Sequence, residues 1–239
     1  MRLALVVIAV GCGGSSGPVA PAPIANDAPI ATRATPAPTI AWLSTDNAFD
    51  TSALPVIARA AEIAVVAVHD SDGGRGYPNL RLEVRDRNDR TIQTIAVMAS
   101  SDYEKLVADN QASTELQRGI ATANRELAKL HGLHDLVAMQ PLAIQKPAEG
   151  TPHLAIGDDL DVDFTTTRID VFHHGAQRPF TSTSWRVPAV PARCAGENPA
   201  FLQAVYKARD IRALVVEVAY RGTDTCWEPG NQLRVITWQ

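Results

Sequence analysis

Ile63-Ala64-Val65-Val66-Ala67-Val68 is an unbroken apolar run, and it constrains the architecture of the chain more than any other segment. Successive side chains of a strand point to opposite faces of a sheet, so this strand must be covered on both faces. We therefore expect it near the centre of a sheet. Leu80-Arg81-Leu82-Glu83-Val84-Arg85 alternates apolar with charged residues, which predicts a second strand with one apolar face. Thr91–Met98 is expected to complete an antiparallel meander.

A helical insertion at about residues 101–131 should follow the meander. Ser101-Asp102-Tyr103-Glu104 has the form of a capping box, which marks the start of a helix, and Gly132 is a candidate for its end. Apolar residues at alternating spacings of four and three form one stripe: Leu116, Ile120, Ala123, Leu127 and Leu130. Packing on the sheet is the expected use of this stripe, and a coiled-coil partner is the alternative.

The C-terminal part of the chain predicts further short strands and a second helix. Strands are expected at residues 161–164, 168–172, 180–185, 213–220 and 233–238. Asn198-Pro199 resembles an N-cap followed by proline at the first helical position, which predicts a helix over 200–208. The expected fold class is α+β, mainly antiparallel β-sheet with the helical insertion and a C-terminal helix-hairpin. One globular body is expected over residues 40–239, with possible halves at 40–140 and 141–239.

The first and last predicted hairpins share a pattern, and each has a long loop. Residues 59–68 and 209–218 both begin with arginine, followed by a Val-Val pair and another valine at the same spacings. Duplication and convergence both explain this. The loops, residues 69–79 and 220–231, exceed the roughly two to five residues usual for hairpins, and long loops on rigid sheets often carry function. Candidate binding residues are Asp70, Asp72, Arg75, Tyr77, Arg221, Asp224 and Trp227. The alternative is that both loops are solvated connections.

Two sets of residues raise the question of catalysis or metal binding. Asp159, Asp161 and Asp163 alternate, so a strand would place three carboxylates on one face, where they could hold calcium. A solvated strand face explains them without a metal. His69 lies next to Asp70 and could form an acid–base pair, although the sequence shows no orienting partner. We assign no catalytic residue and expect no cofactor.

The start of the chain is a short apolar segment after one basic residue. Leu3–Val10 would rise only about 12 Å as a helix, against roughly 30 Å of hydrocarbon, so it cannot span a bilayer. The segment suits the core of a signal peptide, and a buried N-terminal strand is the alternative. Six prolines among small residues follow within residues 13–39, which predicts an extended tether.

Ala9-Val10-Gly11-Cys12 resembles the lipobox of bacterial lipoproteins, although Ala9 stands where leucine is usual. The resemblance implies a signal peptide at residues 1–11, a tether at 12–39, and acyl chains on Cys12 that anchor the chain in a membrane. Gly13, which is not aspartate, implies the outer membrane of the cell envelope. With Cys12 acylated, Cys194 and Cys226 remain as a pair for a disulfide, and metal binding by these two cysteines is the alternative.

Two short motifs of the body resemble known bacterial families. Asp72-Gly73-Gly74-Arg75-Gly76-Tyr77-Pro78 is similar to a hairpin loop of predicted secreted proteins. Asp224-Thr225-Cys226-Trp227-Glu228-Pro229 is similar to a motif of uncharacterised lipoproteins of myxobacterial type. These families have no established activity to carry over.

The 239 residues carry a net charge of −4 and no basic cluster, which argues against nucleic acid as a partner. The predicted function is a non-catalytic interaction or accessory role in the envelope, with an envelope protein or glycan as partner. The alternative is an envelope hydrolase or metal-binding enzyme that uses His69, Asp70 or the aspartates at 159–163.

Overall fold

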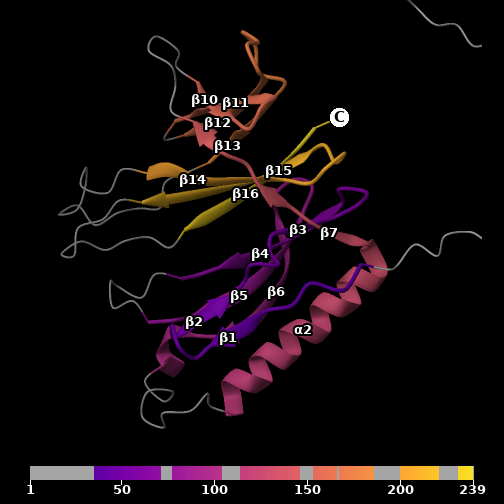
Figure 1. Ribbon diagram of the computed structural model, residues 1–239, viewed down its shortest axis with the longest axis vertical. Helices are drawn as coiled ribbons and strands as arrows, with labels where there is room; N and C mark the ends of the chain where they lie inside the picture. Colours follow the sequence, from indigo (N-terminus) through magenta and orange to yellow (C-terminus); the bar gives the residue numbers. More distant parts are fainter. Residues whose placement is uncertain are drawn as a thin grey trace, which may run out of the picture. The chain divides into compact units, whose positions relative to one another are not determined.

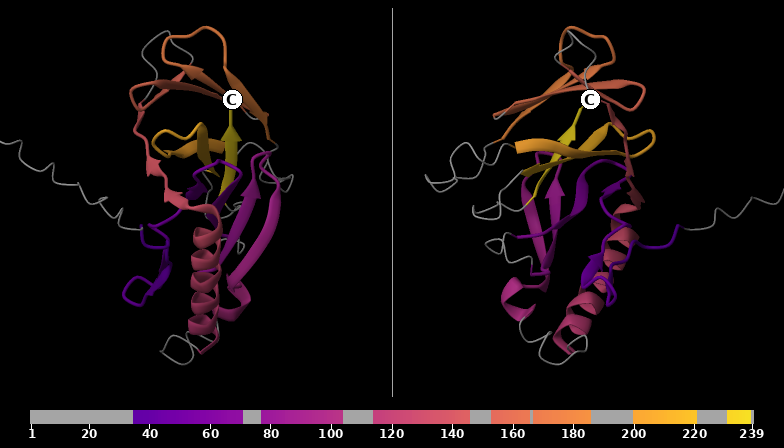
Figure 2. Two further views of the ribbon diagram at one scale, coloured as in Figure 1. Left: turned by 90° about the vertical axis from the view of Figure 1, so that its right-hand side faces the viewer. Right: turned by 60° about the vertical axis from the view of Figure 1, so that its left-hand side comes forward.

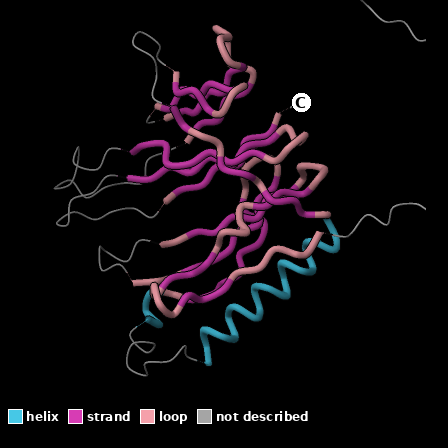
Figure 3. The backbone as a smooth tube through the Cα atoms, in the orientation of Figure 1, coloured by secondary structure: helices cyan, strands magenta, loops and turns pink. Residues whose placement is uncertain are grey.

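β4 (Ile63–Val68) is the middle strand of a five-stranded antiparallel sheet, in agreement with its two apolar faces. The computed structural model describes residues 35–70, 77–103, 114–145, 153–165, 167–185, 200–220 and 231–238. Apart from Thr35, all of them belong to one compact unit, Pro36–Gln239. Figure 1 labels the elements, and Figure 3 colours them by type.

The sheet around β4, which we call the first sheet, has the strand order β6-β5-β4-β3-β7. Its other strands are β3 (Val56–Ala58), β5 (Leu80–Asp86), β6 (Thr91–Met98) and β7 (Leu136–Ala138). β4, β5 and β6 pair antiparallel in sequence order, so the predicted meander is confirmed.

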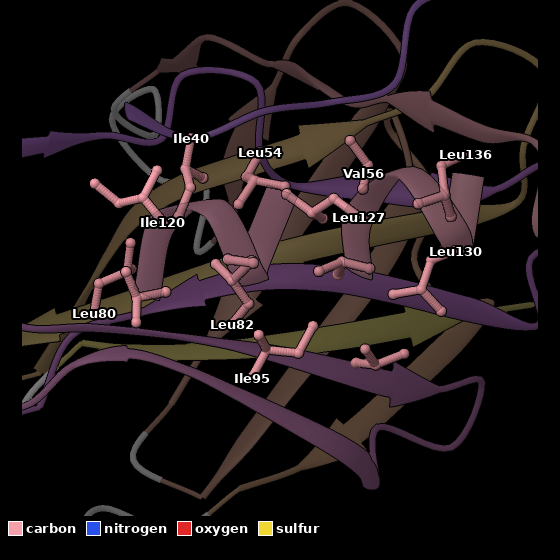
Figure 4. Packing of buried hydrophobic residues seen from close by; sticks show 14 of the residues in the cluster. Ile40, Leu54, Val56, Leu80, Leu82, Ile95, Ile120, Leu127, Leu130 and Leu136 are labelled. Atoms are coloured by element: carbon pink, nitrogen blue, oxygen red, sulfur yellow. The ribbon is translucent and has the colours of Figure 1, made fainter. Parts of the chain in front are cut away.

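The helix α2 (Thr114–His134) covers one face of the first sheet. All five residues of the predicted stripe are buried, and Figure 4 shows three of them, Ile120, Leu127 and Leu130, against Leu82 and Ile95 of the sheet. The helix continues past Gly132, so the prediction that it ends there is wrong. Asp135 follows with a left-handed φ of 48° and donates its N–H to the carbonyl of His131 at 2.9 Å. A 3₁₀ turn, η1 (Ser100–Asp102), precedes the helix, and residues 104–113 lie outside the described part.

Gly119 fixes how closely α2 approaches the sheet. A Cβ atom at this position would lie 2.1 Å from the carbonyl oxygen of Val97 on β6. Glycine costs helix stability in general, but here it removes a clash with backbone. The close approach places the apolar stripe of the helix directly on the strands.

A second sheet has the strand order β16-β15-β14-β8. Its strands are β8 (Gln140–Pro141), β14 (Ala200–Lys207), β15 (Ala213–Tyr220) and β16 (Gln232–Thr237). The prediction of a helix over 200–208, and with it the C-terminal helix-hairpin, is therefore wrong. β15 is buried along nearly its whole length and needs hydrogen-bonded neighbours on both edges; β14, rich in β-favouring Phe, Val and Tyr, supplies one of them.

A third sheet has the strand order β13-β12-β11-β10-β9. Its strands are β9 (Ile144–Gln145), β10 (Leu154–Ile156), β11 (Leu160–Phe164), β12 (Arg168–His173) and β13 (Thr181–Ser184). A small hairpin of β1 (Ala41–Leu43) and β2 (Ala48–Asp50) completes the strands. Beside it, the side-chain amide of Asn124 on α2 bonds both the N–H and the carbonyl of Ile40.

Three apolar clusters stack the elements into layers. The first lies between α2 and the first sheet. The second lies between the other face of the first sheet and the second sheet, where Val66 packs with Val215 and Val235. The third lies between the second and third sheets, around Val216 and Val171. The order of layers is helix, first sheet, second sheet and third sheet, which can be followed in Figure 2.

Candidate functional site

The base of the first hairpin loop is closed by one buried side chain, Asn79. Its Oδ1 accepts the N–H of Asp70 at 2.6 Å, and its Nδ2 donates to the carbonyls of Asp70 and Tyr77 at 2.9 and 3.2 Å. Nδ1 of His69 lies 2.6 Å from the carbonyl oxygen of Asn79. Because a carbonyl only accepts, this nitrogen carries a proton.

Asp70 pairs with Arg81 and not with the neighbouring His69. Arg81 also binds Glu83 at 2.9 Å, so the aspartate belongs to a chain of charges along β5. The structure therefore gives no pairing of His69 with Asp70 for acid–base work. Tyr77, the other described residue among the loop candidates, packs on Tyr103 with ring centroids 5.0 Å apart.

A buried network of charges joins β5 to β16. Arg85 binds Glu83 at 2.7 Å and Asp89 at 2.9 Å, and it donates to the carbonyl of Leu233 on β16. Glu83 and Arg85 are only 7% and 8% exposed. Asp89, whose φ of 61° suits a short polar residue, accepts the N–H of Val235 at 2.9 Å. We call these contacts the cross-sheet lock.

The carboxyl of Glu83 is ionised within the lock. Burial alone would raise its pKa, but hydrogen bonds and attraction from Arg85 and Arg81 outweigh burial and lower the pKa below its usual value. Thr91 donates a further hydrogen bond to this carboxylate at 3.1 Å. The charges of the lock are thus mutually compensated and hydrogen-bonded, which buried charges require.

The lock fixes the relative direction of the two long hairpins. Arg85, near the end of β5, meets Leu233, near the start of β16, and Thr237 at the end of β16 donates to the carbonyl of Arg87 in the turn beyond β5. β16 therefore runs in the same direction as β5 and is displaced toward the β5–β6 turn. Each of these strands begins directly after one of the two long loops.

The base of the second hairpin loop is also held by polar contacts. Glu217 on β15 accepts from Asn231 at 2.6 Å and from the hydroxyl of Tyr206 at 3.4 Å. Burial and the adjacent Glu217 carboxylate raise the pKa of Tyr206. Burial also raises the pKa of Tyr220 to about 12, although Arg234 opposes the shift. The hydroxyl of Tyr220 has no hydrogen-bond partner among the described residues.

The three alternating aspartates go to three different partners. Asp159 binds Lys207 at 2.7 Å, Asp161 binds Nδ1 of His174 at 3.1 Å, and Asp163 binds Nδ1 of His153 at 2.5 Å. Asp161 and Asp163 lie on the same face of β11, as their spacing predicts. In the described part of the chain, no three His, Cys, Asp or Glu residues come together as a metal would require.

Asp161 is the more deeply buried of the two paired aspartates. Burial would raise its pKa, but the N–H of Gly175 at 2.9 Å, the hydrogen bond of His174 and the nearby imidazoles of His174 and His153 lower it below the usual value. An ionised carboxylate only accepts, so Nδ1 of His174 carries a proton and Nε2 is the atom that can exchange one. Asp161 thus orients the imidazole of His174, as a carboxylate does for the histidine of a general-base site.

Sequence reasoning missed the lock and the His–Asp pairs. Arg81, Glu83 and Arg85 were predicted as the polar face of β5, but the second sheet covers part of that face. The clue was the Arg-x-Glu-x-Arg order, which lets neighbouring side chains on one face compensate each other. His173 and His174 diverge: the first stacks on Phe180, and the second turns back to Asp161.

The remaining predicted residues lie outside the described part of the chain. These are Cys12, Asp72, Arg75, Cys194, Arg221, Asp224, Cys226 and Trp227, together with the predicted signal peptide and most of the tether. The comparisons with known proteins give no family: no family model, curated protein or solved structure matches the chain. Among the described residues, no helix is both long and apolar enough to cross a bilayer.

Proposed function

We propose that this chain is a lipoprotein of the cell envelope, anchored through acyl chains on Cys12, whose body binds an envelope protein or glycan through its two long hairpin loops. The sequence Leu3–Cys12 supports the anchor, and the small-residue pattern before the cysteine supports cleavage there. Several acyl chains hold a protein stably, since each buried methylene contributes about 0.8 kcal/mol. Sorting to the outer membrane, from Gly13, is part of the proposal.

The cross-sheet lock is the observation that carries the binding role. It sets β5 and β16 in one direction through buried, hydrogen-bonded charges, so the strands that follow the two loops are held by the same contacts. Loops that extend from a rigid frame can present residues from distant parts of the sequence as one surface. Arg75 and Arg221 are the cations of the two loops, and Trp227 is the largest aromatic residue.

Acylation is tested by changing Cys12 to Ser in the full chain and expressing it in a bacterium that processes lipoproteins. We expect the wild-type chain in the membrane fraction with an acylated Cys12 peptide by mass spectrometry, and the variant in the soluble fraction. A membrane-bound wild-type chain whose N-terminal peptide is unmodified and still contains Met1–Gly11 would overturn the anchor.

Binding is tested by capture from solubilised envelope with full-length chain and three variants. Tyr77→Ala and Tyr103→Ala both remove the contact between the two rings, and Tyr103→Ala also removes packing against the core beneath α2, so it should lower the melting temperature at least as much. Arg75→Ala should leave the melting temperature unchanged. We expect loss of the partner with Arg75→Ala and Tyr77→Ala only. If Tyr103→Ala also lost the partner, and the loss of capture followed the fall in melting temperature across the variants, the loops would have a structural role only.

A disulfide between Cys194 and Cys226 belongs to the same proposal, because an envelope compartment is oxidising. The disulfide would close the segment between Cys194 and Cys226 into a loop. In the chain-entropy account, this restricts the unfolded chain and contributes about 3–4 kcal/mol to the free energy of unfolding. Thiol labelling of chain purified without reductant is expected to find neither cysteine free. Two labelled thiols per chain at these positions would contradict the disulfide.

The second candidate function is hydrolysis, which the His153–Asp163 and His174–Asp161 pairs favour. Each carboxylate orients an imidazole, as a general base requires. Ester and peptide substrates should then be cleaved by the wild-type chain and not by the His153→Gln, His174→Gln double variant. Equal rates for both proteins would remove this candidate.

A further inference from the structure

The side of α2 that points away from the first sheet carries three cations. Arg118, Arg125 and Lys129, which we call the cationic row, are exposed, and their spacing places them on one side of the helix, opposite its buried apolar stripe. The two acidic residues of the helix, Glu115 and Glu126, lie together on one flank. The other exposed residues on the outward side are short: Ala121, Ala128 and Gly132. The long basic side chains therefore project furthest from the helix.

The cationic row is only weakly compensated by the residues around it. Among the described residues, Arg118 and Arg125 have no acidic partner, and Arg125 donates to the hydroxyl of Thr122 at 3.1 Å. Lys129 lies 3.8 Å from Glu126, and its side chain is 66% exposed. Exposed ion pairs of this kind contribute little. The row therefore presents positive charge to the solvent, on a chain whose net charge is −4.

The first described residues of the body lie beside the same helix. Ile40 packs in the apolar cluster of α2, and the side-chain amide of Asn124 bonds the N–H and the carbonyl of Ile40 at 2.8 and 3.0 Å. Figure 4 shows Ile40 next to Ile120, and in Figure 1 the indigo segment before β1 runs along the helix. The segment that leads to Cys12 therefore joins the body beside α2.

Nothing in the described part of the chain covers the cationic row. α2 contacts β6 and β7 through its buried side. In the left-hand view of Figure 2 the helix lies in front of the first sheet, and no described strand passes over it. A cationic surface attracts an anionic one, and this surface lies where the chain departs toward its proposed anchor.

We infer that the cationic row docks on the anionic phospholipid headgroups of the membrane that holds Cys12, an inference that rests on the proposed anchor. The predicted tether, residues 13–39, reaches at most about 80 Å, so it keeps α2 near that membrane at a high effective concentration. A weak contact then suffices, and each basic side chain near an anionic surface raises the affinity about fivefold. Docking turns the helix layer toward the lipid and leaves the third sheet as the layer furthest from it.

Vesicle flotation of the full-length chain with Cys12→Ser, in which no acyl chain contributes, tests the docking. The vesicles contain phosphatidylcholine alone or mixed with phosphatidylglycerol. At low salt, the triple variant Arg118→Gln, Arg125→Gln, Lys129→Gln should bind the mixed vesicles about 100-fold more weakly than its parent, and raised salt should remove the difference. Both chains should bind phosphatidylcholine equally. Residues 1–11 are common to both, so their contribution cancels in these ratios.

The matched control is Arg87→Gln, Arg90→Gln, Arg178→Gln, which makes the same change in net charge at exposed arginines outside α2. It should bind the mixed vesicles as its parent does. Equal loss in both triple variants, or parent binding that does not depend on phosphatidylglycerol, would overturn the inference. Unchanged vesicle binding with loss of an acidic protein from envelope capture would also overturn it. An unmodified Cys12 overturns the anchor alone, because the vesicle ratios measure the cationic row without acyl chains.

Discussion

The second sheet contacts a neighbouring sheet on each face, and the two interfaces are built differently. Toward the first sheet, apolar packing is combined with the buried charges of Glu83, Arg85 and Asp89, and the last two of these bond to the backbone of β16. Toward the third sheet the buried residues are apolar, and the carboxylates of Asp161 and Asp170 lie on the opposite face of that sheet. Among the described residues, one ion pair, Lys207 with the exposed Asp159, joins these two sheets outside the apolar cluster. Hydrogen bonds are directional and apolar contacts are not, so the first interface specifies which residues of β16 meet β5, whereas the buried part of the second depends on shape.

The largest test of this comparison is the removal of Arg85. Arg85→Ala removes the buried cation that Glu83 and Asp89 share and leaves each with one arginine that is less buried, Arg81 and Arg234 respectively. Loss of one partner of a buried ion pair costs about 3–5 kcal/mol, and the remaining arginines place this variant at the lower end of that range. Arg90→Ala is the control, because Arg90 is exposed and its pair with Asp86 should contribute less than about 1 kcal/mol. Denaturant unfolding measures both. Equal effects would show that the lock adds nothing beyond a surface ion pair.

The packing of α2 on the first sheet provides the next test, because among the described residues this contact has no buried charges and depends on the fit of the two surfaces. Gly119→Ala places a methyl group against the backbone of Val97, and the shift that this forces should cost about 1–3 kcal/mol. Gly132→Ala changes the same residue type in the same helix where nothing lies within 4 Å, so it should stabilise by up to about 1 kcal/mol. Thermal unfolding should show opposite signs. A neutral Gly119→Ala would mean that the helix can move away from the sheet.

Acid titration tests the outer face of the third sheet, which takes part in neither interface. The folded-state pKa of Asp161 is lowered, so its ionised form stabilises the fold above the unfolded-state pKa near 3.9, and this contribution is lost as the pH falls through the folded value. Asp161→Asn replaces hydrogen bonds to a charged group by hydrogen bonds to a neutral one, so it should lower the free energy of unfolding by about 1 kcal/mol at pH 7. The free energy of unfolding of Asp161→Asn should also fall less steeply than that of the wild type as the pH is lowered. Asp159→Asn is the control, because it makes the same change in net charge. If it flattened the pH dependence equally, the effect could not be attributed to the buried Asp161 carboxylate.

The smallest expected effect compares one tyrosine on each face of the second sheet. Tyr206 donates to Glu217, so Tyr206→Phe should cost about 0.5–1.5 kcal/mol. Tyr220 packs toward the third sheet, and its hydroxyl has no partner among the described residues, so Tyr220→Phe should change stability by less than about 0.5 kcal/mol. Thermal unfolding of both variants checks this. A large loss of stability from Tyr220→Phe would contradict this comparison.

Elements with a clear apolar pattern could be predicted from the sequence. The apolar run of β4 and the stripe of α2 gave their burial correctly, since each pattern records which faces are covered. β14 could not be recognised, because the spacing of Leu202 and Val205 also fits a helix and the deciding partner, β15, lies later in the chain. Local signals at Asn198 and Gly132 were likewise overridden by tertiary pairing and by the turn at Asp135.

The candidate site could be predicted only where its contacts are local. The spacing of Asp161 and Asp163 correctly placed both on one face, but their histidine partners lie 10 and 13 residues away in other loops. The cross-sheet lock was harder still to predict, because no residue near Arg85 in the sequence indicates that its side chain contacts the backbone of β16. Alternation of charged residues shows a polar face and does not show whether another sheet will cover it.

The position of β16 in the chain has a consequence for synthesis. Its bonds to Arg85, Asp89 and Arg87 span 148, 146 and 150 residues. Contacts at such separations form late, because a long loop must close before they contribute. Glu83 and Arg85 on β5 therefore stay uncovered until β16 has been synthesised. A chain truncated before Leu233 lacks these contacts, so we expect a protease to cleave its first sheet faster than that of a chain that contains β16.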